Sequence, residues 1–240
     1  MLIESFVKSG QHRFPMSRKI GFETRAARAF GLKNYALAIR HLTDLLECVG
    51  ENPHTLHMLA LCRMAELYCR RGEYDKGLGY AQKALTQAMY DPAANYIYGV
   101  VSRRLGNLVD AKEALGWAAR SMQFRSTAYG QLAELHLLEE NHQLAEDYAR
   151  KALDYNRFNV TAYQLLAATY RVSGRSKEAK RVVEQLLDMD PLNHFARFEL
   201  YLQRPSARTL KSFQSMVRNE FPKETYVELA LYYVITSDME

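Results

Sequence analysis

The stretch VTAYQLLAATYRVSGRSKEAKRVVEQLLDMDPLN, residues 160–193, decides the fold. Its first half places apolar or small residues at the i, i+3, i+4, i+7 spacing of a helix with one buried side: Tyr163, Leu166, Ala167 and Tyr170. Gly174 follows and offers the left-handed backbone conformation that favours a helix C-terminus. A second helix with Ala179 on its inner side comes next, so the stretch predicts two helices joined by a tight turn.

Small residues recur through the chain at intervals of 34. Three series keep this interval: Ala65, Gly99, Ala133 and Ala167; Gly77, Ala111, Ala145 and Ala179; Ala84, Ala118 and Ala152. Larger side chains at these places would hold two crossing helices apart. A fixed period of this length indicates stacked units, none of which buries its apolar face alone. The chain is therefore expected to provide a binding surface rather than a catalytic centre.

The positions of these residues within each repeat resemble the tetratricopeptide repeat. Counted from Val160, a small residue stands eighth, Tyr eleventh, Gly fifteenth, Ala twentieth and Pro thirty-second. The resemblance covers the chain from about residue 19 to its end and is strongest over 58–193. It implies an all-α fold, a right-handed superhelical solenoid of stacked helix-turn-helix repeats. It also implies a concave groove, lined by the first helix of each repeat, that receives a peptide or a partner's helix.

The repeat divides the chain into an irregular N-terminal segment, residues 1–16, and a tetratricopeptide array, residues 17–240. The repeats are expected near residues 19–57, 58–91, 92–125, 126–159 and 160–193, with a short repeat at 194–222 and a half repeat at 223–240. About thirteen helices should form. First helices are expected near 17–31, 54–71, 92–105, 126–139, 160–173, 193–203 and 223–236. Second helices are expected near 35–49, 74–90, 108–122, 142–155, 176–189 and 206–219.

Two places depart from the repeat. In the first repeat, 39 residues separate Ala26 from Ala65, and the additional residues are expected around 50–53. At the other end, no second helix follows the helix near 223–236. Its large apolar residues should then lack neighbours, and the end should self-associate or fray: Val227, Leu231, Tyr232, Val234 and Ile235. The array is accordingly interpreted as a piece of a longer protein, and segments such as DPAANYIYG resemble repeat arrays of large bacterial multidomain proteins.

The charge distribution argues against a nucleic-acid partner. The formal net charge is +5, but residues 1–40 hold eight Lys and Arg against Glu4 and Glu23, so the remainder sums to about −1. A nucleic-acid groove needs its basic residues along the binding face. No apolar run is long enough to span a bilayer, so no membrane partner is expected. Three cysteines without a pairing framework favour a reducing, cytoplasmic location.

Motifs of catalysis are absent from the sequence, and no cofactor, metal or enzymatic activity is expected. His54 and His57 are three apart, but no acidic or Cys cluster completes a metal site, so a solvated helix start is the better interpretation. His136 stands where other repeats have Tyr and is expected to pack between helices. Glu139 and Glu140 are adjacent and point apart on a helix, so they are expected to be solvated turn residues.

The candidate site is therefore the groove. Positions five, nine and twelve of each first helix share one face. The candidate protein-binding residues taken from these positions are Cys62, Glu66, Tyr96, Val100, Arg103, Glu134, Leu137, Gln164, Arg171 and Phe198. This apolar floor with Arg and Glu suits a peptide or an amphipathic helix. Cys62 and Glu66 stand where related proteins carry Lys and Asn to hold a chaperone's C-terminal carboxylate, so that clamp is not expected.

Two functions are compatible with these features of the sequence. The first is a non-catalytic protein–protein interaction scaffold that binds a peptide or partner helix in its groove. The second is a rigid structural segment of a larger multidomain enzyme, whose groove or open end contacts the parent's own domains.

Overall fold

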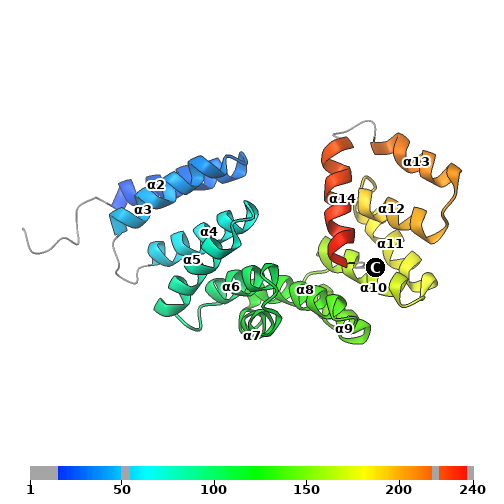
Figure 1. The fold of residues 1–240 in the computed structure, drawn as a ribbon, viewed down its shortest axis with the longest axis horizontal. Coiled ribbons are helices and arrows are strands. Elements are labelled where there is room, and N and C mark those ends of the chain that lie inside the picture. Colours follow the sequence, from blue (N-terminus) through cyan, green and yellow to red (C-terminus); the bar gives the residue numbers. More distant parts are fainter. Residues whose placement is uncertain (1–15, 50–54, 218–221, 237–240) are drawn as a thin grey trace, which may run out of the picture. The chain divides into compact units, whose positions relative to one another are not determined.

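The computed structural model describes residues 16–49, 55–217 and 222–236, and within these ranges every regular element is a helix. The chain divides into two compact halves, Met1–Ala118 and Ala119–Glu240 (Figure 1). The N-terminal half contains α2 (Met16–Gly31), α3 (Tyr35–Val49), α4 (Thr55–Arg70), α5 (Tyr74–Gln87), α6 (Pro92–Arg104) and α7 (Leu108–Ala118). The C-terminal half contains α8 (Met122–Leu138), α9 (His142–Tyr155), α10 (Val160–Val172), α11 (Ser176–Met189), α12 (His194–Gln203), α13 (Ala207–Val217) and α14 (Pro222–Thr236).

The helices pack as sequential pairs, as the 34-residue period predicts. From α2 to α11, each first helix packs most extensively against its own second helix, as α4 does with α5 and α8 with α9. Within each half, the next largest contact is with the preceding second helix. α12 differs, because it packs more extensively on the preceding α11 than on α13. The predicted all-α array of thirteen helices is confirmed for the described residues.

A left-handed residue ends the first helix in five repeats. Its backbone φ is positive at Lys33, Gly72, Gly106, Glu140 and Gly174. Glycine adopts this conformation without steric cost, whereas a residue with a Cβ does not. The turn geometry is therefore kept by the repeat even at the two positions where the sequence has Lys or Glu.

Small residues stand where two helices of a pair cross most closely. A Cβ added to Gly99 of α6 would lie 2.7 Å from the Leu115 side chain and 3.1 Å from the carbonyl oxygen of Ala111, both on α7. At Gly77 of α5, it would lie 3.1 Å from the carbonyl oxygen of Ala65 on α4. Gly and Ala recur at these places because the backbones of the two helices lie too close together for larger side chains.

One junction differs from the predicted helix limits. α7 ends at Ala118 and α8 begins at Met122, each about four residues earlier than expected. The Arg125 guanidinium donates to the carbonyl oxygens of Ala119 (3.0 Å) and Arg120 (2.9 Å), the first residues after α7. These bonds satisfy carbonyl groups that a helix end leaves open. The segment between α7 and α8 contains no Pro or Gly to interrupt a helix, so α8 begins about one turn earlier than expected.

Candidate functional site

In the N-terminal half, the predicted site residues lie on α4 and α6 and are mostly packed. Burial raises the pKa of the Cys62 thiol to about 12, and the Asp91 carboxylate adds to this effect while Arg63 opposes it. A thiol held protonated in this way is a packing residue and not a nucleophile. Glu66 is ion-paired to Arg63 and Arg70, each at 3.0 Å. The carboxylate therefore already has cationic partners on its own helix.

The three candidates on α6 differ in exposure. Tyr96 and Val100 are half-buried, whereas Arg103 is only 7 % exposed. Arg103 is therefore not a freely accessible floor residue, in contrast to what its position in the repeat predicts. Its charge lies within the helix stack rather than on an open surface.

A cavity beside α4 was not predicted from the sequence. It has a volume of about 200 Å³ and lies between α2, α3 and α4. Its lining is mainly apolar and includes Phe30, Leu45 and Leu67, with one acid and one base, Glu23 and Arg63. Because the first repeat departs from the 34-residue spacing, counting positions along the repeat does not extend to α2.

In the C-terminal half, the predicted residues Glu134 and Leu137 lie on α8, Gln164 and Arg171 on α10, and Phe198 on α12. Leu137 is 5 % exposed and belongs to the core of this half, so it is not an accessible groove residue. Gln164 lines a cavity of about 420 Å³.

Phe198 and Arg171 meet at one place. The Phe198 ring centroid lies 5.2 Å from those of Phe213 and Tyr233. Arg171 donates from Nε to Glu199 Oε2 at 3.1 Å, and its guanidinium lies 5.7 Å from the Tyr233 ring centroid. The structure therefore brings these two predicted residues together through two others, Glu199 and Tyr233.

Glu199 is a site residue that counting repeat positions does not identify. It is completely buried on α12, and its carboxylate accepts hydrogen bonds from Arg171 and from the Tyr233 hydroxyl, the latter at 2.8 Å. Burial, followed by the Glu199 carboxylate, raises the pKa of Tyr233, so the phenol stays protonated and donates. A single acid inside the largely apolar stretch FARFELYL was the available signal, because buried carboxylates need partners.

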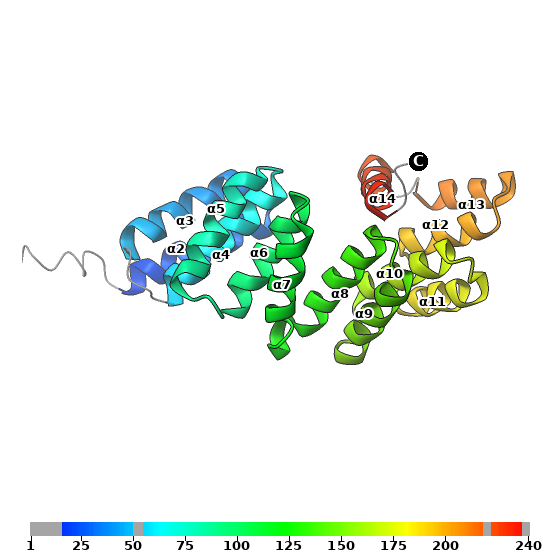
Figure 2. The same ribbon diagram turned by 60° about the horizontal axis from the view of Figure 1, so that its bottom comes forward.

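The helix that carries Tyr233 lies on the candidate face. α14 contacts α12 and also α8, and Figure 2 shows it across the side of this half formed by the first helices α8, α10 and α12. Leu229 is 8 % exposed and joins the core of this half together with Tyr232 and Tyr233. The expectation that Tyr232 would lack neighbours is therefore wrong, because α14 turns its apolar side inward.

Two further expectations about α14 have different outcomes. Val227 is 52 % exposed, as predicted. Leu231, Val234 and Ile235 lie outside the described side chains. Self-association through this end stays a prediction.

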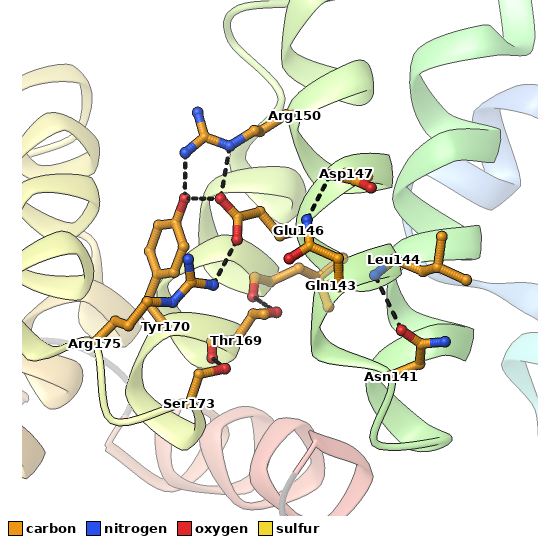
Figure 3. Close-up of polar contacts among 11 residues, drawn as sticks. Asn141, Gln143, Leu144, Glu146, Asp147, Arg150, Thr169, Tyr170, Ser173 and Arg175 are labelled. Carbon is orange, nitrogen blue, oxygen red and sulfur yellow. Dashed lines mark hydrogen bonds and ion pairs between the residues drawn. The ribbon is translucent and has the colours of Figure 1, made fainter.

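A second polar cluster in this half is structural. Glu146 of α9 accepts hydrogen bonds from Arg150 Nε (2.9 Å), the Tyr170 hydroxyl (2.8 Å) and Arg175 (2.5 Å), as Figure 3 shows. Burial acts to raise the pKa of Glu146, but the hydrogen bonds from Arg175, Tyr170 and Arg150 outweigh it and leave the pKa lowered. Burial and the bond to Glu146 raise the pKa of Tyr170 to about 12. The hydrogen-bonding groups of this cluster belong to two successive repeats, so it joins them.

The histidines and acids considered for chemistry have structural places. His57 is 8 % exposed and its Nδ1 lies 3.0 Å from Gln87 Oε1, so the expected solvated position is wrong, while His54 lies outside the described residues. His136 stacks on Tyr148 with ring centroids 5.3 Å apart, which confirms its packing role. Glu139 and Glu140 are exposed turn residues, as expected.

The described part of the chain shows neither a metal cluster nor a membrane segment. In it, no three His, Cys, Asp or Glu side chains gather as a metal site would require. Likewise, none of its helices combines the length and the apolar character needed to cross a bilayer.

Helix pairs that follow one another in the chain, turn at a left-handed residue and cross at small residues define a helical-repeat protein. A tetratricopeptide repeat family model matches residues 126–159 and 160–191. Comparison with curated protein sequences gives no match. Residues 126–159 and 160–191 are thus tetratricopeptide repeats.

Solved structures share this fold. PilW, a type IV pilus biogenesis factor, is 18 % identical, with a TM-score of 0.72 over 87 % of this chain and 96 % of its own. PilF of Pseudomonas aeruginosa is 16 % identical, with a TM-score of 0.68 over 89 % of this chain and 97 % of its own. YrrB, described as a TPR protein with an unusual peptide-binding site, is 17 % identical, with a TM-score of 0.52 over 81 % and 95 %. At these identities the likeness establishes the fold.

Proposed function

We propose that this protein is a non-catalytic scaffold that binds a peptide or a partner helix on the faces formed by its first helices. Tetratricopeptide repeat proteins generally mediate protein–protein interaction. The observation that carries the proposal is that one such face already holds a helix: α14 lies on α12 and α8 through Leu229, Tyr232 and Tyr233. A surface that accepts a helix of its own chain has the shape and polarity for a foreign one.

The residues on these faces support recognition of a helix or an extended peptide. Half-buried Tyr96 and Phe198 are aromatic. The guanidinium of Arg171, whose Nε is bonded to Glu199, lies over the Tyr233 ring that Phe198 also contacts. Aromatic and Arg side chains commonly contribute most of the binding energy at interfaces. The peptide-binding description of YrrB is in keeping with this use of the fold.

Site-specific crosslinking followed by a substitution scan tests the proposal. A photoreactive amino acid is placed at Tyr96 or Gln164 in the full chain, and the captured partner is identified and purified. Its affinity is then measured for Tyr96→Ala, Arg103→Lys, Arg171→Ala and Phe198→Ala. The variants of at least one half of the protein should bind the partner tenfold or more weakly, which is equivalent to about 1.4 kcal/mol.

The matched control is Val109→Ala on α7, which removes an apolar side chain that is 77 % exposed on a second helix. Circular dichroism of each variant separates lost binding from lost folding. If all four groove variants bind as the wild type does, the first-helix faces are not the site.

A structural segment of a larger multidomain enzyme is the second candidate. The outer side of α14 supports it, because Val227 is 52 % exposed there. In that case the crosslinked peptide would come from another domain of the same polypeptide. We further propose a reducing, cytoplasmic compartment, with which the three free cysteines Cys48, Cys62 and Cys69 are in keeping.

A further inference from the structure

The last helix departs from the stacking order of the repeats. Within the C-terminal half, α10 packs on the preceding α9, and α12 on the preceding α11. By the same rule α14 would pack mainly on α13. In the described residues it meets α13 through the rings of Tyr226 and Phe213, whose centroids lie 6.4 Å apart, but its main contacts are with α12 and α8. α14 therefore lies across the first helices rather than continuing the stack, as Figure 2 shows.

Two adjacent aromatic residues attach α14 to this face. The Tyr232 and Tyr233 ring centroids lie 4.7 and 5.9 Å from that of Phe195, and Tyr233 lies 5.2 Å from Phe198. The Tyr233 hydroxyl donates to Glu199 at 2.8 Å. The contact thus combines an aromatic anchor with one buried, charge-assisted hydrogen bond.

The same contact uses the residues proposed to bind a partner. Phe198 packs on Tyr233, Arg171 lies over its ring, and the Glu134 carboxylate contributes to raising the pKa of Tyr232 after burial and Glu199. These residues come from α8, α10 and α12. A partner helix on this face would therefore need the space that α14 occupies.

The fit of α14 to this face is incomplete at its edge. A solvent-open cleft of about 420 Å³ separates α14 from the neighbouring residues, with Gln164, Asp190 and His194 on one side and Thr225, Leu229 and Tyr232 on the other. α14 therefore covers part of the face without closing over all of it.

Resting on the proposed function, we propose that α14 is an internal ligand of the face formed by α8, α10 and α12. The external ligand of this face is a partner's amphipathic helix with two adjacent aromatic residues, one of them a tyrosine whose hydroxyl donates to Glu199. It binds in exchange for α14. The partner helix needs this tyrosine because the carboxylate of Glu199 is completely buried. A helix without a hydroxyl donor at this place would leave the carboxylate without one of its hydrogen bonds.

The chain's own helix supplies the probe for the test. A fluorescent peptide of residues 222–236 is titrated into the full chain and its anisotropy is measured. The variant Leu229→Asp places a charge on the buried side of α14 and should release it, whereas Val227→Asp places the same charge on the exposed side. Because an occupied site binds in proportion to its free fraction, Leu229→Asp should bind the peptide at least tenfold more tightly than the wild type and Val227→Asp.

Two further measurements make the result specific. In the Leu229→Asp chain, a peptide carrying Tyr233→Phe should bind about tenfold more weakly, since it lacks the donor to Glu199. In the wild-type chain, hydrogen exchange over α14 should be faster than over α10. A Tyr233→Phe peptide that binds equally well, equal affinity of wild type and Leu229→Asp, or equal protection of the two helices would each overturn the proposal.

Failure of this test is distinguishable from failure of the proposed function. The peptide is part of this chain, so the measurement does not depend on a partner. If a partner is lost on Arg171→Ala but the peptide never competes with α14, the scaffold function stands and the internal ligand is excluded.

Discussion

The α2–α4 face of the N-terminal half and the α8–α10–α12 face of the C-terminal half are built from the same repeat but differ in what they hold. The first has an apolar cavity of about 200 Å³ with Glu23 and Arg63 in its lining. The second carries α14, held by Tyr233 and the buried Glu199. The repeat thus specifies the helix stack, whereas single residues that depart from its pattern determine what each face holds.

The tyrosine at position eleven of a repeat also makes different contacts in the two halves. Tyr68 stacks on Tyr80 of its own repeat, with ring centroids 5.5 Å apart and nearly parallel. Tyr170 donates to Glu146 of the preceding repeat, and Tyr233 donates to Glu199 on α12. One sequence position thus supports packing within a repeat, between repeats, and between the stack and α14.

The largest effect should come from the ion pairs of the two faces. Arg171→Ala removes the cationic partner of the buried Glu199 carboxylate, and it should lower the free energy of unfolding by about 3 kcal/mol. Arg63→Ala breaks a pair in which the side chains are 54 % and 26 % exposed, and it should cost less than about 1 kcal/mol. Urea unfolding of both variants measures the difference, and equal costs would contradict the contrast between the faces.

The next effect is a dependence on pH. Glu146→Gln should lower the free energy of unfolding by about 2 kcal/mol at pH 7, because it loses charge-assisted hydrogen bonds. The folded-state pKa of Glu146 is lowered. Its contribution is therefore complete above the unfolded pKa and is lost as the pH falls through the folded one. Stability measured between pH 7 and pH 3 should fall less steeply in the variant than in the wild type.

Glu73 in the N-terminal half is the control for this pH dependence. The hydrogen bond from Lys76 lowers its pKa, but the group is open to solvent. Water screens such a pair, so Glu73→Gln should follow the wild-type curve. A Glu73 variant with the flatter profile and a Glu146 variant without it would reverse the assignment.

Glycines on first helices should respond in opposite directions in the two halves. Gly99→Ala places a Cβ within 2.7 Å of Leu115, and the strain should outweigh the helix propensity gained, for a net loss of about 1 kcal/mol. At Gly130 of α8, the nearest atom to a new Cβ is Asn159 Nδ2 at 3.9 Å, so Gly130→Ala should stabilise by up to about 1 kcal/mol. Thermal unfolding measures both, and shifts of the same sign would contradict this difference between the halves.

The smallest effect concerns the left-handed turns. Lys33→Gly and Glu140→Gly remove the Cβ at positions where φ is 55° and 58°. Each should gain about 0.5–1 kcal/mol of stability, since the left-handed conformation disfavours non-glycine residues. Gly174→Ala is the reverse experiment and should lose a similar amount. A loss in both glycine variants would show that the Lys33 and Glu140 side chains contribute contacts that outweigh the strain.

The sequence predicted what depends on local spacing. The thirteen helices follow from the 3.6-residue period and the turn residues, and the crossing points follow from Gly99 and its counterparts. The cap of α13 is local in the same sense, since Ser206 Oγ accepts from the Thr209 amide at 3.1 Å.

What the sequence did not predict depends on contacts between distant residues. Counting positions treats every repeat alike, so it could not distinguish buried Arg103 and Leu137 from half-buried Tyr96. The place of α14 depends on the pairing of Tyr233 with Glu199, which are 34 residues apart. That separation equals one repeat, so the pattern alone predicts a stacked neighbour there and not a helix lying across the face.

The cluster around Glu146 also has a mechanical consequence. It connects α9 to Tyr170 of α10 and to Arg175 before α11, so it spans the boundary between two repeats. The stability of a repeat array is approximately the sum of its repeat and interface terms, and these bonds strengthen one interface selectively. Stretched between its ends in a force spectrometer, the chain should release these two repeats in a single rupture event, whereas Glu146→Gln should split that event into two smaller ones.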